Sequence, residues 1–457
     1  MDHEVIVIGG GPGGYVAAIK AAQAGKKTCV VEAEHLGGVC LNEGCIPTKT
    51  LIRTVDLFSQ CKRAEEFAVE GVDPAALKVS MKKLQARKKQ VVTQLVSGVR
   101  GLLKGNGVTV ETGRARFLDP HTLDVNGKQI TGDNIIIATG SETSMAGFIQ
   151  REGDTNIITS REALSLEEVP ASMAIIGGGV IGVELAFVYA SLGCSVTILE
   201  LMDRILPMVD EEVSSIARKR LSKQGITILT SAKVKAIRGR QVAYELDGRE
   251  QTVDCACVLL SVGRAPNTAE LDLEKAGVAL NGKAIETDAH MRTNVPGIYA
   301  IGDVNGKSML AHTASHEGCV AVKNICGEPA EMHYNAIPSC IYLEPEIASV
   351  GLTEAQAREQ RGAVRVGKFP LRANGKALIE GETDGMIKVI LDEELGEILG
   401  VHIYGPRATD MIAELSLAMS MEATADEVLE AVHPHPTFSE IVPEAFMAAV
   451  GKAVHNL

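Results

Sequence analysis

A chain of 457 residues is too long for one hydrophobic core, so about two to four domains are expected. Hydrophobic residues make up 46% of it, and the net charge of −13 argues against nucleic acid or an anionic membrane as a partner. Residues 1–4 are acidic and lead into an apolar strand pattern, so no secretory signal or transit peptide is expected and the predicted location is cytoplasmic.

The first element in the chain is one half of an internal repeat. Residues 6–32, IVIGGGPGGYVAAIKAAQAGKKTCVVE, are similar to residues 174–200, AIIGGGVIGVELAFVYASLGCSVTILE. Each copy predicts an apolar strand, a G-x-G-x-x-G turn, a helix and a second strand that ends on glutamate. The shared positions are Gly9, Gly11, Gly14 and Glu32 in the first copy, and Gly177, Gly179, Gly182 and Glu200 in the second.

Two complete copies of this pattern predict two dinucleotide sites. The glycines permit a tight turn, a close approach of backbone to a pyrophosphate, and close packing of helix on strand. The terminal glutamate suits a ribose hydroxyl. Because a carboxylate at Glu200 repels a 2′-phosphate, NAD is favoured over NADP, although Arg204 close by leaves NADP open.

Between the first repeat and the next helical pattern lies GGVCLNEGCIPTKT, residues 37–50. Glycines allow Cys40 and Cys45 to approach each other, and a thiol at a helix N-terminus is stabilised as a thiolate, so a redox pair is predicted. A zinc site and inert core cysteines are the alternatives, and no second Cys/His pair with suitable spacing supports zinc. Cys255 and Cys257 alternate in an apolar run and are predicted to line one face of a strand.

The rest of the chain predicts further helices and a different C-terminal architecture. Residues 80–103 predict an exposed helix, and the apolar stretch 173–193 predicts a buried strand and helix because Glu184 and a glycine cluster interrupt it. From residue 337 onward, alternating strands at 385–392 and 397–405 precede helices. In HPHPTFSE, residues 433–440, a histidine held by a carboxylate could act as a base, and two surface histidines in a proline-rich loop are the alternative.

Taken together, these segments resemble the pyridine nucleotide–disulfide oxidoreductases along nearly the whole chain. The resemblance rests on GGVCLNEGCIPTK, on IIIATGS at 135–141 and on IYAIGD at 298–303. It implies an α/β fold with two Rossmann-like dinucleotide-binding domains, for FAD and NAD, and a C-terminal α+β dimerisation domain. The expected parts are a first FAD-binding segment at 1–143, an NAD-binding domain at 144–263, a central FAD-binding segment at 264–336 and the dimerisation domain at 337–457.

The resemblance also implies roles for individual residues. Cys40 is similar to the interchange thiol and Cys45 to the sulfur beside the flavin, while His435 resembles the catalytic base with Glu440 as its orienting carboxylate. Lys49 resembles the lysine near the flavin N5, paired with Glu184. The expected FAD contacts are Gly9, Gly11, Gly14, Glu32, Lys49, Gly113, Thr139, Gly140, Ser141, Asp303 and Ala311. The expected NAD contacts are Gly177, Gly179, Ile181, Gly182, Glu200, Val234 and Gly263, and no metal is expected.

Within the family, GRAPNT at 263–268, MLAH at 309–312, PEIASVGLTE at 345–354 and HPHPTFSE favour a member that oxidises protein-bound dihydrolipoamide and reduces NAD⁺. The resemblance then implies a homodimer in which the second copy supplies His435. It also implies lipoyl domains as partners, either on the acyltransferase core of a 2-oxoacid dehydrogenase complex or on the lipoyl carrier protein of glycine cleavage. An NAD(P)H-dependent, glutathione reductase-like reductase of another small disulfide is the alternative, which Val180 and Glu200 disfavour. A docking or sensor flavoprotein is a third hypothesis.

Overall fold

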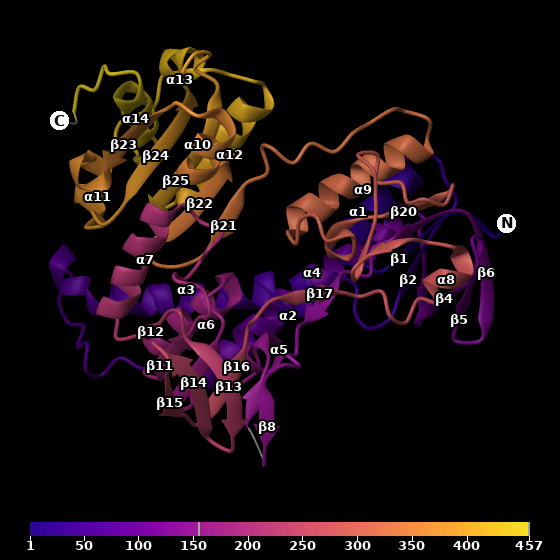
Figure 1. Cartoon of the computed structure of the whole chain (residues 1–457), viewed down its shortest axis with the longest axis horizontal. Coiled ribbons are helices and arrows are strands. Elements are labelled where there is room, and N and C mark those ends of the chain that lie inside the picture. Colours follow the sequence, from indigo (N-terminus) through magenta and orange to yellow (C-terminus); the bar gives the residue numbers. More distant parts are fainter. Residues whose placement is uncertain (154–155, 456–457) are drawn as a thin grey trace.

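The computed structural model describes residues 1–153 and 156–455, and Figure 1 shows its arrangement. The N-terminal half forms a sheet whose central strands are parallel and buried, as their apolar sequences predict. Its strand order is β3 (Thr109–Thr112), β2 (Thr28–Glu32), β1 (His3–Ile8), β6 (Lys128–Ile137), β5 (Thr122–Val125) and β4 (Ala115–Asp119). The much later strand β20 (Ile298–Ala300) pairs in parallel with β6, so residues from about 300 return to this sheet.

The second repeat forms a second parallel sheet. Its order is β12 (Thr227–Leu229), β11 (Ser195–Leu199), β10 (Ser172–Ile176), β16 (Cys257–Leu260) and β9 (Ile157–Ile158). An antiparallel ribbon lies beside it, made of β15 (Arg249–Asp254), β14 (Gln241–Leu246) and β13 (Lys233–Arg238), with β8 (Gln150–Glu152) along β13. The predicted repeat is confirmed, because β1, α1 (Pro12–Gln23) and β2 correspond to β10, α6 (Val180–Ser191) and β11.

The helices of the N-terminal part pack closely because small residues line their contacts. Helix α1 packs on α9 (Ala311–Ile325), where a Cβ added to Gly13 would lie 2.9 Å from the Ala314 carbonyl oxygen. Two consecutive helices, α2 (Gly38–Glu43) and α3 (Cys45–Lys62), follow the first repeat, and α3 contacts both α4 (Met81–Gly105) and α6. The stretch 173–193 is a buried strand and helix, as predicted. Among the described residues, no helix is both long and apolar enough to cross a membrane.

The C-terminal part is an antiparallel sheet with helices, as predicted (Figure 1). Its strand order is β21 (Ser339–Ile341), β22 (Glu346–Gly351), β25 (Ile398–Gly405), β24 (Met386–Asp392) and β23 (Val364–Pro370). The alternation expected for the strands at 385–392 and 397–405 is not found as alternating burial, because every residue of β25 and every residue of β24 except Asp392 is buried. Sheet contacts come from α12 (Ala408–Ser420), α14 (Ile441–Ala449), α10 (Glu354–Arg361) and α7 (Glu211–Lys223), the last of which belongs to the second repeat.

One sequence prediction about the cysteines is wrong. Cys257 begins β16, whereas Cys255 precedes it in the turn after β15, so the two do not share a strand face. They are buried in different hydrophobic clusters, Cys257 with Ile175 and Cys255 with Ile176. The apolar run contains a turn between two strands, and periodicity alone did not reveal it.

Candidate active site

The two predicted redox cysteines lie on consecutive helices and contact each other. Cys40 is half-buried in α2, and Cys45 is the exposed first residue of α3, after Gly44. Neither cysteine is in a disulfide. A hydrogen bond from the Cys40 thiol lowers the pKa of Cys45 to about 7; desolvation by the protein atoms around the Cys45 sulfur opposes this shift, and the Lys49 ammonium assists it. The same contact, together with burial, raises the pKa of Cys40. Cys45 is therefore the better thiolate of the pair.

Lys49 and Glu184 form an ion pair behind the cysteines. The Lys49 Nζ lies 2.9 Å from both carboxylate oxygens of Glu184, which has only 4% of its side chain exposed. The backbone N–H of Tyr342 donates to Glu184 Oε1 at 2.9 Å, and the Lys49 Nζ lies 4.5 Å from the centre of the Tyr342 ring. Burial raises the pKa of Glu184, and the Lys49 ammonium opposes that shift. The charge in the apolar helix α6 is thus explained by its partner in α3.

The first glycine-rich turn has the shape that a pyrophosphate requires. A Cβ added to Gly9 would lie 2.3 Å from the Ala138 carbonyl oxygen, and one added to Gly14 would lie 1.9 Å from the Gly9 carbonyl oxygen. At the middle position, Gly11, the nearest atom to an added Cβ is 3.9 Å away. The outer glycines therefore permit close packing, while the middle one leaves open space before the N-terminus of α1.

The second turn repeats this geometry. An added Cβ would lie 2.4 Å from the Ser261 carbonyl oxygen at Gly177 and 2.2 Å from the Gly177 carbonyl oxygen at Gly182. At Gly179 no atom lies within 4 Å. Both turns therefore fit a dinucleotide on the free N–H groups at the start of a helix.

The two terminal glutamates also bind the turns themselves. Glu32 Oε2 accepts a hydrogen bond from the Gly10 N–H at 2.6 Å, and Glu200 accepts one from the Gly178 N–H. Their other oxygens accept backbone N–H groups, including that of Met202 at 2.7 Å. Each carboxylate therefore orders its glycine turn in addition to the ribose role expected from the sequence.

The Asp303 segment has partners that sequence reasoning missed. The Ser141 hydroxyl donates to Asp303, and Arg264 Nε donates to Ser141 Oγ at 2.7 Å. Glu317, fully buried in α9, accepts the Gly302 N–H at 2.5 Å and the Tyr334 hydroxyl at 2.6 Å. Arg264 lies in the GRAPNT segment and Glu317 begins the EG pair that follows MLAH, but neither was predicted as a contact residue.

The other residues expected at the FAD site lie around the carboxyl edge of the first sheet. The Gly113 N–H donates to the Glu32 carbonyl oxygen at 2.9 Å, next to the end of β2. Thr139 Oγ1 donates to the Asn267 carbonyl oxygen at 2.7 Å, and Gly140 follows with a φ of +70°. Ala311 is the first residue of α9.

The other residues expected at the NAD site come from α6, β13 and the segment before β17. Ile181 is half-buried in the first turn of α6, beside Gly182. Val234, on β13, is buried in a cluster with Ile176 and Leu199, the last residues of β10 and β11. Gly263, with a φ of +117°, precedes β17 (Arg264–Pro266), which pairs with β7 (Ser141–Thr143).

His435 and Glu440 form the predicted histidine–carboxylate pair. His435 Nδ1 lies 2.8 Å from Glu440 Oε1, and the Thr437 N–H donates to Glu440 Oε2 at 2.9 Å. Although partial burial acts to raise it, the pKa of Glu440 is lowered by these hydrogen bonds. The His435 side chain is 78% exposed, and Nδ1 is engaged, so Nε2 is the ring nitrogen available to a substrate.

Within one chain the histidine pair and the cysteine pair are not brought together. Helix α2 lies near the middle of Figure 1, while α13 (Ala425–Glu430) and α14, which flank His435, lie in the C-terminal domain at its upper left. Among the described residues, no three His, Cys, Asp or Glu side chains are grouped as metal ligands would be.

Comparison with known proteins identifies the class. The family model for pyridine nucleotide–disulphide oxidoreductases matches residues 3–318, and the model of that family's dimerisation domain matches residues 337–446. The chain belongs to the pyridine nucleotide–disulphide oxidoreductases, and its C-terminal domain is the type through which the family dimerises.

Individual relatives are more specific. A dihydrolipoyl dehydrogenase of Bacillus subtilis is 45% identical, with 100% of this chain and 98% of that protein covered. One from Geobacillus stearothermophilus is 44% identical over the same shares. Among solved structures, LpdA of Mycobacterium tuberculosis has a TM-score of 0.88 at 27% identity, covering 97% of this chain and 99% of that one. A HOCl-induced flavoprotein disulfide reductase of Escherichia coli, RclA, has a TM-score of 0.86 at 28% identity, covering 98% and 99%.

Proposed function

We propose that this chain catalyses the oxidation of protein-bound dihydrolipoamide to lipoamide with reduction of NAD⁺. The observation that carries the proposal is the contact of Cys40, on α2, with Cys45 at the start of α3, next to the Lys49–Glu184 ion pair. The dihydrolipoyl dehydrogenases at 40–45% identity along the full chain favour this substrate over other disulfides.

In the proposed reaction, one dihydrolipoamide thiol loses its proton to His435 Nε2 and attacks Cys40 Sγ of the oxidised pair. The Cys40–Cys45 bond breaks, and Cys45 leaves as a thiolate, which its lowered pKa favours. The second lipoyl thiol then displaces Cys40 from the mixed disulfide and releases lipoamide. The imidazolium gives its proton to the leaving Cys40 sulfur, and the proton of the second lipoyl thiol passes through His435 to solvent. The electron pair is now held by the reduced cysteine pair, with Cys40 as a thiol and Cys45 as a thiolate.

We propose that FAD binds at the first glycine-rich turn and NAD⁺ at the second. A bound FAD would supply the chemistry that takes the electron pair from the reduced cysteine pair and passes it to NAD⁺ as a hydride. Lys49 lies beside the redox pair, where its ammonium, held by Glu184, stabilises negative charge. Glu440 holds the His435 ring so that Nε2 faces outward.

We further propose that a complete site needs two copies of the chain. Helix α2, which carries Cys40, and helices α13 and α14, which flank His435, lie apart in one chain (Figure 1), and the domain that carries His435 is the dimerisation domain. In this proposal His435 of a second copy faces Cys40. The proposed partners beyond the dimer are lipoyl domains of a 2-oxoacid dehydrogenase or glycine cleavage complex. The cytoplasmic location expected from the sequence stays a prediction.

The domain boundaries expected from the sequence also become a proposal. We propose that the chain leaves the FAD-binding part near residue 143 and returns near residue 264. The antiparallel pairing of β7 with β17 supports this division, because the two crossings then lie side by side. The return of β20 to the first sheet supports the assignment of 264–336 to the FAD-binding part.

The test is anaerobic reduction of the purified FAD-loaded protein with dihydrolipoamide, followed by addition of NAD⁺ or NADP⁺. We expect a long-wavelength thiolate–flavin absorbance that NAD⁺ discharges and NADP⁺ does not. No reduction by dihydrolipoamide, together with ready reduction by NADPH, would instead assign the protein to reductases of another small disulfide. A Cys45→Ser protein that keeps its full biological function would favour the docking or sensor hypothesis.

A further inference from the structure

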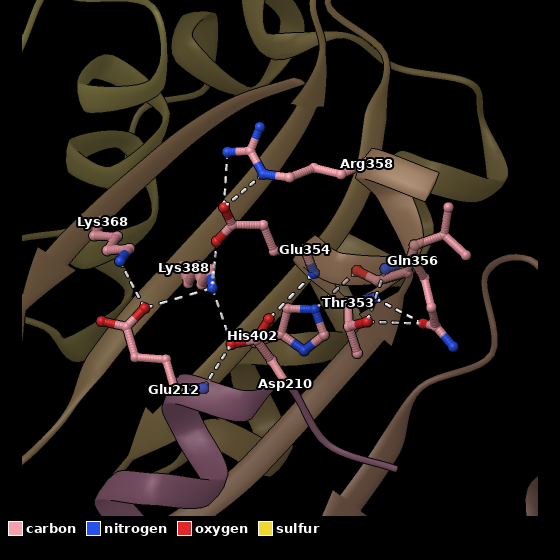
Figure 2. A network of polar contacts seen from close by, with 10 residues as sticks. Asp210, Glu212, Thr353, Glu354, Gln356, Arg358, Lys368, Lys388 and His402 are labelled. Carbon is pink, nitrogen blue, oxygen red and sulfur yellow. Dashed lines mark hydrogen bonds and ion pairs between the residues drawn. The ribbon is translucent and has the colours of Figure 1, made fainter. Parts of the chain in front are cut away.

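A buried lysine joins the C-terminal domain to the second repeat (Figure 2). Lys388, on β24, has 4% of its side chain exposed, and its Nζ lies 2.9 Å from Asp210 Oδ1 and 2.7 Å from Glu354 Oε2. Glu212 lies farther away, at 3.4 Å, and also binds Lys368 at 2.6 Å. A buried ammonium needs partners of this kind, and here Asp210 and Glu212 come from the other domain.

Asp210 uses both carboxylate oxygens to connect the two domains. Its Oδ1 accepts the Glu212 N–H at 3.2 Å and so caps the N-terminus of α7, while its Oδ2 accepts the Glu354 N–H at 3.2 Å. The side chain of Asp210 is only 3% exposed. Without Lys388, this carboxylate would be buried with no ammonium beside it, a costly arrangement that displaces the segment carrying it.

That segment is the loop 201–209, which runs from Glu200 to Asp210. Its middle is fixed to α7, because Ser214 Oγ donates to the Ile205 carbonyl oxygen at 2.6 Å. Ile205 and Leu206 are buried, whereas Met208 is 86% exposed. The loop therefore buries Ile205 and Leu206 against the protein while Leu201, Met202 and Met208 stay exposed, and α7 and Asp210 set its position.

Ile205 and Leu206, the buried residues of the loop, contact the second glycine-rich turn. The Leu206 N–H donates to the Gly178 carbonyl oxygen at 2.8 Å. A Cβ added to Gly178 would lie 2.9 Å from Ile205 Cγ2, so the loop covers this glycine closely. Continuous contacts thus run from Lys388 through Asp210, α7 and the loop to the turn that would bind the NAD⁺ pyrophosphate.

We propose that Lys388 is a positioning residue for nucleotide binding: it fixes Asp210 and thereby holds the 201–209 loop against the Gly177–Gly182 turn. The dimerisation domain thus sets the affinity of a site that it does not touch. This inference rests on the proposed binding of NAD⁺ at the second turn. Because these contacts end at the Gly177–Gly182 turn, we expect the dithiol half-reaction not to depend on Lys388.

The test compares Lys388→Met with Lys368→Met in the FAD-loaded protein. Both remove an ammonium that contacts Glu212, and Lys388 in addition forms the ion pair with Asp210. Binding of ADP-ribose, which carries the pyrophosphate and adenosine of NAD⁺, is measured by calorimetry. We expect Lys388→Met to weaken ADP-ribose and raise the KM for NAD⁺ roughly tenfold, in the range of indirect couplings. Flavin reduction by dihydrolipoamide should be unchanged, and Lys368→Met should behave as the wild type.

Wild-type affinity for ADP-ribose in a folded Lys388→Met protein would overturn the inference. If that variant does not fold or keep FAD, Asp210→Asn decides, because it removes the negative charge while its amide oxygen can still accept the Glu212 N–H of the cap. Unchanged ADP-ribose affinity in Asp210→Asn would then overturn it. Failure of the wild type to bind both ADP-ribose and NAD⁺ would overturn the nucleotide assignment itself, and the role of Lys388 with it.

Discussion

At the scale of single residues, two cysteines of the same side-chain chemistry are made unequal by their positions. Cys45 begins a helix, receives a hydrogen bond from Cys40 and lies near Lys49, and its pKa falls to about 7. Cys40 donates that bond and is held protonated, with a raised pKa. The asymmetry assigns thiolate chemistry to Cys45 and exchange with an incoming thiol to Cys40, in agreement with the proposed roles.

The Cys45 pKa predicts how the reduced protein responds to pH. The thiolate forms as pH rises through about 7, so the long-wavelength absorbance of the FAD-loaded, reduced protein should appear over that interval. Lys49→Met removes a positive charge that lowers this pKa, and the midpoint should move to higher pH. Lys62→Met, at the other end of α3, where Lys62 stacks on Phe58, is the matched control. An identical midpoint in all three proteins would contradict the role of Lys49.

His435→Gln should slow reduction by dihydrolipoamide by roughly 10²–10⁴-fold, the usual worth of general base catalysis, while FAD stays bound. Stopped-flow measurement of the half-reaction gives the rate. The control is His433→Gln, because His433 lies in the same loop but binds Glu414 at 2.8 Å. A rate near that of the wild type for His435→Gln would remove this side chain from the mechanism.

At the scale of elements, the sequence predicted whatever is encoded by local pattern. The two repeats, the buried stretch at 173–193 and the C-terminal sheet have local signatures, and each is present in the structure. The pairing of Lys49 with Glu184 and of His435 with Glu440 came from family resemblance, and both contacts exist.

Contacts between remote segments could not be predicted in this way. Arg264 with Ser141, Glu317 with Gly302, and Lys388 with Asp210 each join segments whose proximity depends on how the sheets assemble. Cys255 was misplaced for a related reason, because an apolar run can contain a turn without changing its composition.

The glycine turns make a prediction about one element. In Gly182→Ala the new Cβ would lie 2.2 Å from the Gly177 carbonyl oxygen and 2.6 Å from Ser261 Oγ, so α6 must shift and NAD⁺ binding should be lost while FAD is retained. Calorimetry with NAD⁺ and the flavin absorbance check both parts. The control is Gly98→Ala in α4, where no atom lies within 4 Å and the helix should gain about 1 kcal/mol. Unchanged NAD⁺ affinity in Gly182→Ala would place the nucleotide elsewhere.

At the scale of the whole molecule, the separation of His435 from the cysteines predicts complementation. Cys45→Ser and His435→Gln homodimers should each be nearly inactive. After unfolding and refolding together, the mixed dimer has one site with intact cysteines and an intact histidine from the other chain. Random assortment then restores about a quarter of wild-type activity. No recovery, with mixed dimers demonstrated by mass spectrometry, would mean that the histidine acts within its own chain.

The ion pair behind the cysteines joins three parts of the chain. Lys49 comes from α3, Glu184 from α6 of the second repeat, and the Tyr342 N–H from the start of the C-terminal domain. This junction constrains the exchange of domains between relatives. A chimera that receives its 144–263 segment from another family member must inherit an acid at position 184. A chimera without that acid leaves Lys49 unpaired beside the cysteines. An exchange of this segment that is meant to change the nucleotide preference would then also disturb electron transfer at the cysteine pair.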